Sequence, residues 1–251
     1  MDLGLQDKVY VVTGGGRGLG RATAELLVAE GARVLVSGRH RAALEEAATS
    51  LGDACLPVVA DNADPTSADR LVGMALDTWG RLDGALVSVG GPPPGSVMTT
   101  SDEAWTRSFD SVFLGAVRIA RSVASAIDGP GSIAFVLSTS VRAPLADLAI
   151  SNGLRPGLGM VAKTLADELG PRGIRVNGLM PGRVETERVR ELDDATGDGD
   201  TARARSIQRI PLRRYGEPEE FGRVAAFLLS PASSFVSGAM VPVDGGMLRA
   251  L

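Results

Sequence analysis

The sequence predicts an α/β protein in which helices cover both faces of one doubly wound parallel sheet. Two observations support this prediction. Short apolar runs alternate with amphipathic stretches along all 251 residues, as they do in repeated strand–helix units. The apolar runs are also nearly uninterrupted, which is typical of parallel strands that are buried on both faces. No internal repeat or linker divides the chain, so residues 1–251 are expected to form a single domain.

The expected elements follow one another in a regular order. Strands are predicted at residues 9–12, 33–36, 56–60, 85–89, 132–137, 174–179 and 239–243. Helices are predicted at residues 22–30, 42–50, 68–78, 102–126, 160–169 and 221–229. The charged segment 184–209 has two interpretations, a solvated loop or a mobile lid over a substrate pocket.

Composition excludes several classes of protein. The net charge of −4 does not suit binding to a nucleic acid backbone. The single cysteine, Cys55, excludes an internal disulfide, and the single histidine, His40, excludes a multi-histidine metal centre. No apolar run is long enough for a membrane span, and the N-terminus does not resemble a signal peptide. We therefore expect a cytoplasmic protein with a small-molecule substrate and no metal.

A glycine-rich turn, TGGGRGLG, links the first predicted strand to the first helix. Glycines let the backbone approach a pyrophosphate closely, and the following helix supplies free N–H groups and a positive dipole end. Because the turn lies between a strand and a helix, it predicts a Rossmann-type dinucleotide-binding site. The residues assigned to this turn are Thr13, Gly14, Gly16, Arg17, Gly18, Leu19 and Gly20.

Together with further motifs, this turn makes the chain resemble the short-chain dehydrogenase/reductase family over nearly its whole length. Thr13, Gly14, Gly18 and Gly20 match the TGxxxGxG turn of that family. Four later segments match in order: Asp61-Asn62, Ser88-Val89-Gly90, Pro181-Gly182 with Thr186, and the C-terminal stretch 241–246.

The resemblance implies a role for each matched segment. In the family, an Asp at the position of Asp61 holds the adenine ring, and a Thr at the position of Thr186 contacts the nicotinamide carboxamide. Gly90 and Pro181-Gly182 are expected to border the same cofactor. The resemblance also implies hydride transfer and assembly into a homodimer or homotetramer.

The stretch after the second strand favours NADP(H) over NAD(H). A carboxylate at this place would bind a free ribose hydroxyl and repel a 2′-phosphate. Residues 37–41 read Ser-Gly-Arg-His-Arg and contain no acid. Arg39 could pair with a phosphate through two hydrogen bonds, and Arg17 is a second candidate.

The catalytic end departs from the family pattern. The family uses a Tyr, a Lys four residues later on the same helix, a Ser and an Asn. Ser138 lies at the position of the Ser. The position of the Tyr holds Ser151, the position of the Lys holds Arg155, and the position of the Asn holds Val112. Neither tyrosine restores the site, because Tyr10 is expected in the core and Tyr215 in a structural role. Lys163 is expected on a helix surface.

The helix that would carry Ser151 and Arg155 is expected to begin late or to be distorted. Gly153, Pro156 and Gly157 are unfavourable inside a helix, so Pro156 is placed near the first turn. On that prediction Ser151 and Arg155 do not share a helix face.

Two functions remain open. The first is an atypical NADP(H)-dependent oxidoreductase acting on a carbonyl, an alcohol or an activated alkene. Its proton would come from Ser138, Ser151, water or the substrate, and Arg155 would stabilise negative charge. The second is a protein of the same fold without this redox activity, either a nucleotide-binding sensor or partner subunit or a non-redox dehydratase or cyclase.

Overall fold

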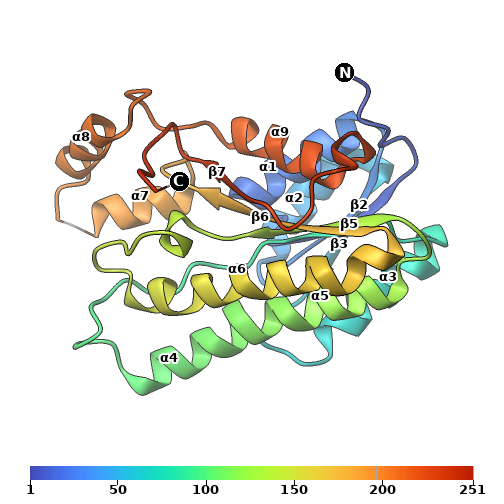
Figure 1. Ribbon diagram of the computed structural model, residues 1–251, viewed down its shortest axis with the longest axis horizontal. Coiled ribbons are helices and arrows are strands. Elements are labelled where there is room, and N and C mark those ends of the chain that lie inside the picture. The colour runs from blue at the N-terminus through green and yellow to red at the C-terminus, as the bar shows by residue number, and fades with distance from the viewer. Residues whose placement is uncertain (196, 251) are drawn as a thin grey trace.

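A seven-stranded parallel sheet forms the centre of the computed structural model, which describes residues 1–195 and 197–250 (Figure 1). The strand order is β3-β2-β1-β4-β5-β6-β7. The strands are β1 Val9–Thr13, β2 Arg33–Gly38, β3 Cys55–Val59, β4 Gly84–Val87, β5 Gly131–Val136, β6 Ile174–Pro181 and β7 Met240–Val243. The predicted doubly wound α/β fold is confirmed.

Helices cover both faces of the sheet and bury two separate apolar cores. One face carries α1 Gly18–Ala29, α2 Arg41–Leu51 and α9 Pro218–Leu229. The other face carries α3 Ser67–Trp79, α4 Asp102–Ser108, α5 Gly115–Ala126 and α6 Ala149–Leu169. Helices α1, α3, α5, α6 and α9 each bury an apolar stripe in these cores. Within the described residues, no helix is long and apolar enough to cross a lipid bilayer.

The chain reverses its winding direction between β1 and β4, which are neighbours in the sheet. Thr13 Oγ1 donates a hydrogen bond to the Ser88 carbonyl at 2.8 Å, and Ser88 N donates to Thr13 Oγ1 at 2.9 Å. This reciprocal pair ties together the carboxyl ends of the two strands. Ligands of open α/β sheets bind in the crevice at such a point.

Helix α6 corrects the expectation of a late helix start. It begins at Ala149, eleven residues before the predicted 160, and Pro156 lies well inside it. Ile150, Leu154 and Leu158 are buried at helical spacing. Burial of this apolar stripe outweighs the poor helix propensity of the intervening glycines and proline. Ser151 and Arg155 therefore do share a helix, one turn apart.

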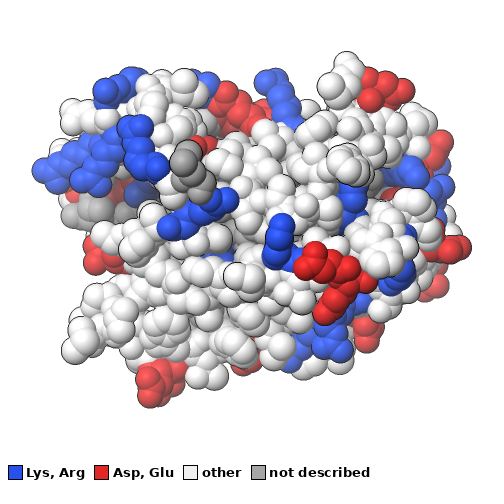
Figure 2. All heavy atoms as spheres, in the orientation of Figure 1, with Lys and Arg blue, Asp and Glu red and all other residues white. Residues whose placement is uncertain are grey.

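Two further segments differ from their predictions. The predicted helix 102–126 is interrupted by a π-helical segment, Phe109–Leu114, between α4 and α5. The segment 184–209 is largely helical, because most of its described residues form α7 Glu187–Asp194 and α8 Gly199–Arg209. Residue 196 of the predicted lid lies outside the described residues. Figure 2 shows basic side chains gathered over α8, whose sequence contains Arg203, Arg205 and Arg209.

Candidate active site

The residues predicted to bind a cofactor gather at the carboxyl edge of the sheet. Because all seven strands are parallel, the segments that follow them meet at this edge. Thr13 ends β1, Arg39 follows β2, and Asp61-Asn62 follow β3. Gly90 follows β4, Pro181 ends β6, and Gly182 and Thr186 come next.

The glycine-rich turn has a backbone conformation and internal packing that require glycine. Gly14 and Gly18 have φ values of 64° and 56°, in the left-handed region that favours glycine. A Cβ on Gly20 would lie 2.3 Å from the Gly14 carbonyl oxygen, so only glycine fits there. Helix α1 begins after Arg17 without a side-chain cap on its first N–H groups. These free donors and the positive helix end fit an anionic group.

Two arginines near this turn differ in their contacts. Arg39 is exposed, and within the described residues no hydrogen bond or ion pair holds its guanidinium. Arg17 is engaged, because its Nη1 lies 2.7 Å from Glu187 Oε2 on helix α7. Asp61 is exposed and accepts a hydrogen bond from Ala63 N at 3.0 Å.

Helix α7 lies against the glycine-rich turn. Thr186 caps this helix by accepting a hydrogen bond from Val189 N. A Cβ placed on Gly18 would lie 3.5 Å from Thr186 Cγ2. Arg188 Nη2 donates to the Pro92 carbonyl at 2.6 Å, in the loop after β4. Glu187 and Arg188 were not singled out in the sequence, because their partners are distant along the chain.

Arg155 is buried at the carboxyl ends of β4 and β5. Its Nη1 donates to the Val136 carbonyl at 2.5 Å, and its Nη2 to the Val89 and Gly90 carbonyls at 3.4 Å each. Its Nε is buried without a partner, and no carboxylate in the described part of the chain pairs with it. Burial lowers the pKa of Arg155 to about 10, so the side chain stays protonated at neutral pH.

Ser140 connects the two serines predicted for catalysis. Its Oγ lies 3.2 Å from Ser151 Oγ, and its backbone N donates to Ser138 Oγ at 3.1 Å. Ser151 is only 6% exposed. The sequence motifs did not single out Ser140, although it lies just two positions after Ser138, beyond the end of β5. The structure thus brings Ser138, Ser151 and Arg155 to one end of β5.

Of the other side chains considered in the sequence, Tyr10 lies in the core and Lys163 on a helix surface, as predicted. Tyr10 is buried, and its hydroxyl donates to the Leu229 carbonyl at 3.1 Å. Tyr215 is buried, donates to Asp193 Oδ2 at 2.8 Å and has Arg203 over its ring. Lys163 is exposed on α6, and Val112 is buried in the π-helical segment.

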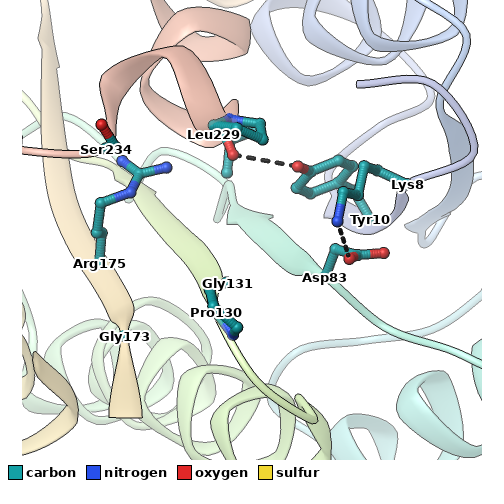
Figure 3. A pocket seen from close by; sticks show the side chains of 10 residues that line it. Lys8, Tyr10, Asp83, Pro130, Gly131, Gly173, Arg175, Leu229 and Ser234 are labelled. Atoms are coloured by element: carbon teal, nitrogen blue, oxygen red, sulfur yellow. Dashed lines mark hydrogen bonds and ion pairs between the residues drawn. The ribbon is translucent and has the colours of Figure 1, made fainter. Parts of the chain in front are cut away.

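A cavity of about 200 Å³ lies at the opposite, amino edge of the sheet (Figure 3). Lys8, Tyr10, Asp83 and Arg175 line it. Lys8 Nζ lies 3.1 Å from Asp83 Oδ1, and Arg175 Nη2 donates to the Ser230 carbonyl at 2.8 Å. These polar groups bind one another and the backbone, so we assign them a role in holding the strands together. No cluster of metal-binding side chains occurs within the described residues.

The seven-stranded parallel sheet, with a glycine-rich turn between β1 and α1, defines a Rossmann-like α/β fold. A family model described as enoyl-(acyl carrier protein) reductase matches residues 14–248. An uncharacterized oxidoreductase of Mycobacterium tuberculosis is 34% identical, over 97% of this chain and 93% of the relative. The chain therefore belongs to the short-chain dehydrogenase/reductase family of oxidoreductases.

Two solved structures of this family show the same fold. L-Sorbose reductase from Gluconobacter frateurii, complexed with NADPH and L-sorbose, is 31% identical with a TM-score of 0.94, and both chains are covered completely. A short chain oxidoreductase from Pseudomonas aeruginosa PAO1, described as containing an atypical catalytic center, is 28% identical with a TM-score of 0.91 and is also covered completely.

Proposed function

We propose that this protein is an atypical NADP(H)-dependent oxidoreductase. It transfers hydride to or from a carbonyl, an alcohol or an activated alkene, and its acid–base site consists of Ser138, Ser151 and Arg155. The observation that carries this proposal is the buried, charged Arg155 one helical turn from Ser151. Burial of a charge without a carboxylate partner is costly, and such groups are concentrated at functional sites.

The cofactor assignment rests on the residues of the carboxyl edge. The free N–H groups of helix α1 suit a pyrophosphate, and Arg39 and Arg17 suit a 2′-phosphate. Asp61 and Asn62 would border the adenine, and Thr186 the nicotinamide carboxamide. The NADPH in the related L-sorbose reductase supports this choice. When bound, the nicotinamide supplies or accepts the hydride.

In this proposal, residues of the protein itself transfer the proton and stabilise the negative charge. The Ser151 and Ser140 hydroxyls, 3.2 Å apart, provide a path for a proton, and Ser138 orients the substrate oxygen. Arg155 remains protonated and stabilises negative charge on that oxygen instead of donating a proton. The relative with an atypical catalytic center supports the view that this fold accommodates other catalytic residues. Helices α7 and α8 serve as the substrate lid.

A second candidate function is nucleotide binding without redox activity. One observation favours it: Ser151 already has a hydrogen-bond partner within the chain, as have both Nη atoms of Arg155. These groups are largely satisfied without a substrate. In this case the protein would act as a sensor or partner subunit, or as a non-redox dehydratase or cyclase.

Nucleotide titration tests the cofactor assignment. We expect NADPH to bind in the micromolar range by fluorescence and NADH to bind more weakly. Arg39→Ala should weaken NADPH binding about tenfold and leave NADH binding unchanged, because only the 2′-phosphate contact is lost. Failure of the unaltered protein to bind either nucleotide would refute the assignment.

Turnover then separates the two candidate functions. NADPH consumption should be measured with a panel of ketones, quinones and enones. Consumption that depends on one of these substrates supports the oxidoreductase. Nucleotide binding without consumption of NADPH across the panel favours the second candidate.

A further inference from the structure

An ion pair joins the glycine-rich turn to the first residue of helix α7. Arg17 Nη1 and Glu187 Oε2 are 2.7 Å apart, and the two side chains are 54% and 60% exposed. An exposed pair of this kind contributes little to stability, so a more highly charged partner displaces it easily.

The next residue ties the same helix to the other side of the crevice. Arg188 Nη2 donates to the Pro92 carbonyl at 2.6 Å. Gly91 makes room for this arginine, because a Cβ there would lie 2.8 Å from Arg188 Nε. Arg17 follows β1 and Pro92 follows β4, the two strands that flank the reversal point. Helix α7 therefore bridges the two sides of the candidate nucleotide site.

The two candidate phosphate ligands are thus not equivalent. Arg39 has no partner within the described residues, whereas Arg17 is already neutralised by Glu187. A phosphate monoester carries nearly two negative charges at neutral pH and binds a guanidinium more strongly than one carboxylate does. A 2′-phosphate that binds Arg17 Nη1 displaces Glu187, and one that binds the other N–H groups of Arg17 meets the negative charge of Glu187 close by. A cofactor without this phosphate leaves the pair intact.

We propose that Glu187 is a selectivity residue, which competes with the 2′-phosphate of NADP(H) for Arg17 and so reduces the preference for NADP(H) over NAD(H). Displacement of Glu187 also removes one contact between helix α7 and the glycine-rich turn, while Arg188 still holds the helix to the loop after β4. This inference rests on the proposed cofactor assignment.

Substitution of Glu187 tests the competition. NADPH and NADH should be titrated by fluorescence into the unaltered protein, Glu187→Gln and Glu191→Gln. Glu191 lies on the same helix and is exposed, and within the described residues its carboxylate pairs with Arg188 alone, at 3.4 Å. Glu187→Gln should raise the ratio of the NADH to the NADPH dissociation constant about threefold, the range expected for loss of an exposed ion pair. Glu191→Gln removes the same charge and should leave the ratio unchanged.

The same substitution in an Arg17→Ala background completes the test. Without Arg17, Glu187→Gln should no longer alter the ratio, because the competition is gone. Three outcomes would overturn the role of Glu187 and leave the cofactor assignment standing. They are an unchanged ratio in Glu187→Gln, an equal rise in Glu191→Gln, and a rise that persists without Arg17. If the unaltered protein binds neither nucleotide, the cofactor assignment fails and this inference fails with it.

Discussion

The burial of the Arg155 charge is unfavourable, yet specific hydrogen bonds hold its guanidinium in place. Its guanidinium is buried, its Nε lacks a partner, and its other nitrogens face three backbone carbonyls. Replacing this charge by an apolar side chain of similar length removes its desolvation cost, which offsets the loss of its hydrogen bonds to the carbonyls. A structural role and a catalytic role therefore predict different effects of substitution.

Arg155→Met should leave the free energy of unfolding within about 1 kcal/mol of the unaltered protein. It should lower kcat at least tenfold for any substrate that the panel identifies, because a charge that stabilises the transition state is lost. Urea unfolding and steady-state kinetics measure the two effects. A loss of about 3 kcal/mol or more with unaltered kcat would show that Arg155 is structural.

Asp83 presents a buried charge that is fully paired. It accepts hydrogen bonds from Val9 N, Lys8 Nζ and Arg81 at 2.7–3.1 Å. Burial alone would raise the pKa of Asp83, but these donors outweigh it and hold the pKa below its usual value. The stabilisation is therefore present above the unfolded pKa and is lost as the pH falls through the folded one.

Asp83→Asn should lower the free energy of unfolding by about 1–3 kcal/mol at pH 7. The difference from the unaltered protein should shrink below about pH 4, where the unfolded carboxylate takes up its proton. Urea unfolding at several pH values measures it. Asp77→Asn, an exposed change on helix α3, is the control and should have little effect. A difference that stays constant down to pH 3 would contradict this account.

At the scale of elements, glycines affect stability in opposite directions in different helices. Gly222 lets α9 approach α1, because a Cβ there would lie 2.9 Å from the Ala22 carbonyl oxygen. Gly73, in α3, has nothing within 4 Å of the corresponding point. The first glycine is required by packing between helices, whereas the second only lowers helix propensity.

Gly73→Ala should therefore raise the free energy of unfolding by about 0.5–1 kcal/mol, the usual gain in helix propensity. Gly222→Ala should lower it by about 1–3 kcal/mol, because backbone atoms cannot move aside as side chains do. Chemical unfolding of both variants provides the comparison. Stabilisation by Gly222→Ala would show that α1 and α9 pack less closely than the structure indicates.

At the scale of the whole molecule, we propose the self-association that the family resemblance implies. Met160 is 68% exposed on the long helix α6, and we place it in the proposed interface because an exposed apolar side chain of this size suits burial between subunits. Val97 is 70% exposed in the loop after β4 and provides a matched control.

Light scattering should give a mass of two or four times 25.9 kDa. Met160→Glu should shift the mass toward the monomer, because a charge would be buried in the interface, whereas Val97→Glu should not. A clean monomer for the unaltered protein would refute this assembly. Equal shifts for both variants would indicate an effect of charge that is not specific to α6.

The sequence by itself determined the fold and the place of the residues that are proposed to bind the cofactor. Strand and helix patterns are local, and in a parallel sheet the carboxyl ends of all strands meet at one edge. The positions of Thr13, Arg39 and Thr186 could therefore be predicted from the motifs alone. The start of α6 could not, because local propensity opposed it, although an apolar stripe including Leu154 and Leu158 was visible in the sequence.

Only the tertiary structure decided how the site is connected. The contacts of Ser140 with Ser151, of Arg155 with the ends of β4 and β5, and of Arg17 with Glu187 join residues 11 to 170 positions apart. Such contacts depend on how the layers pack, which no local pattern records. The sequence therefore determined which residues lie at the carboxyl edge, and packing decided their partners, because partners in a folded chain are set by distance in space and not by distance along the chain.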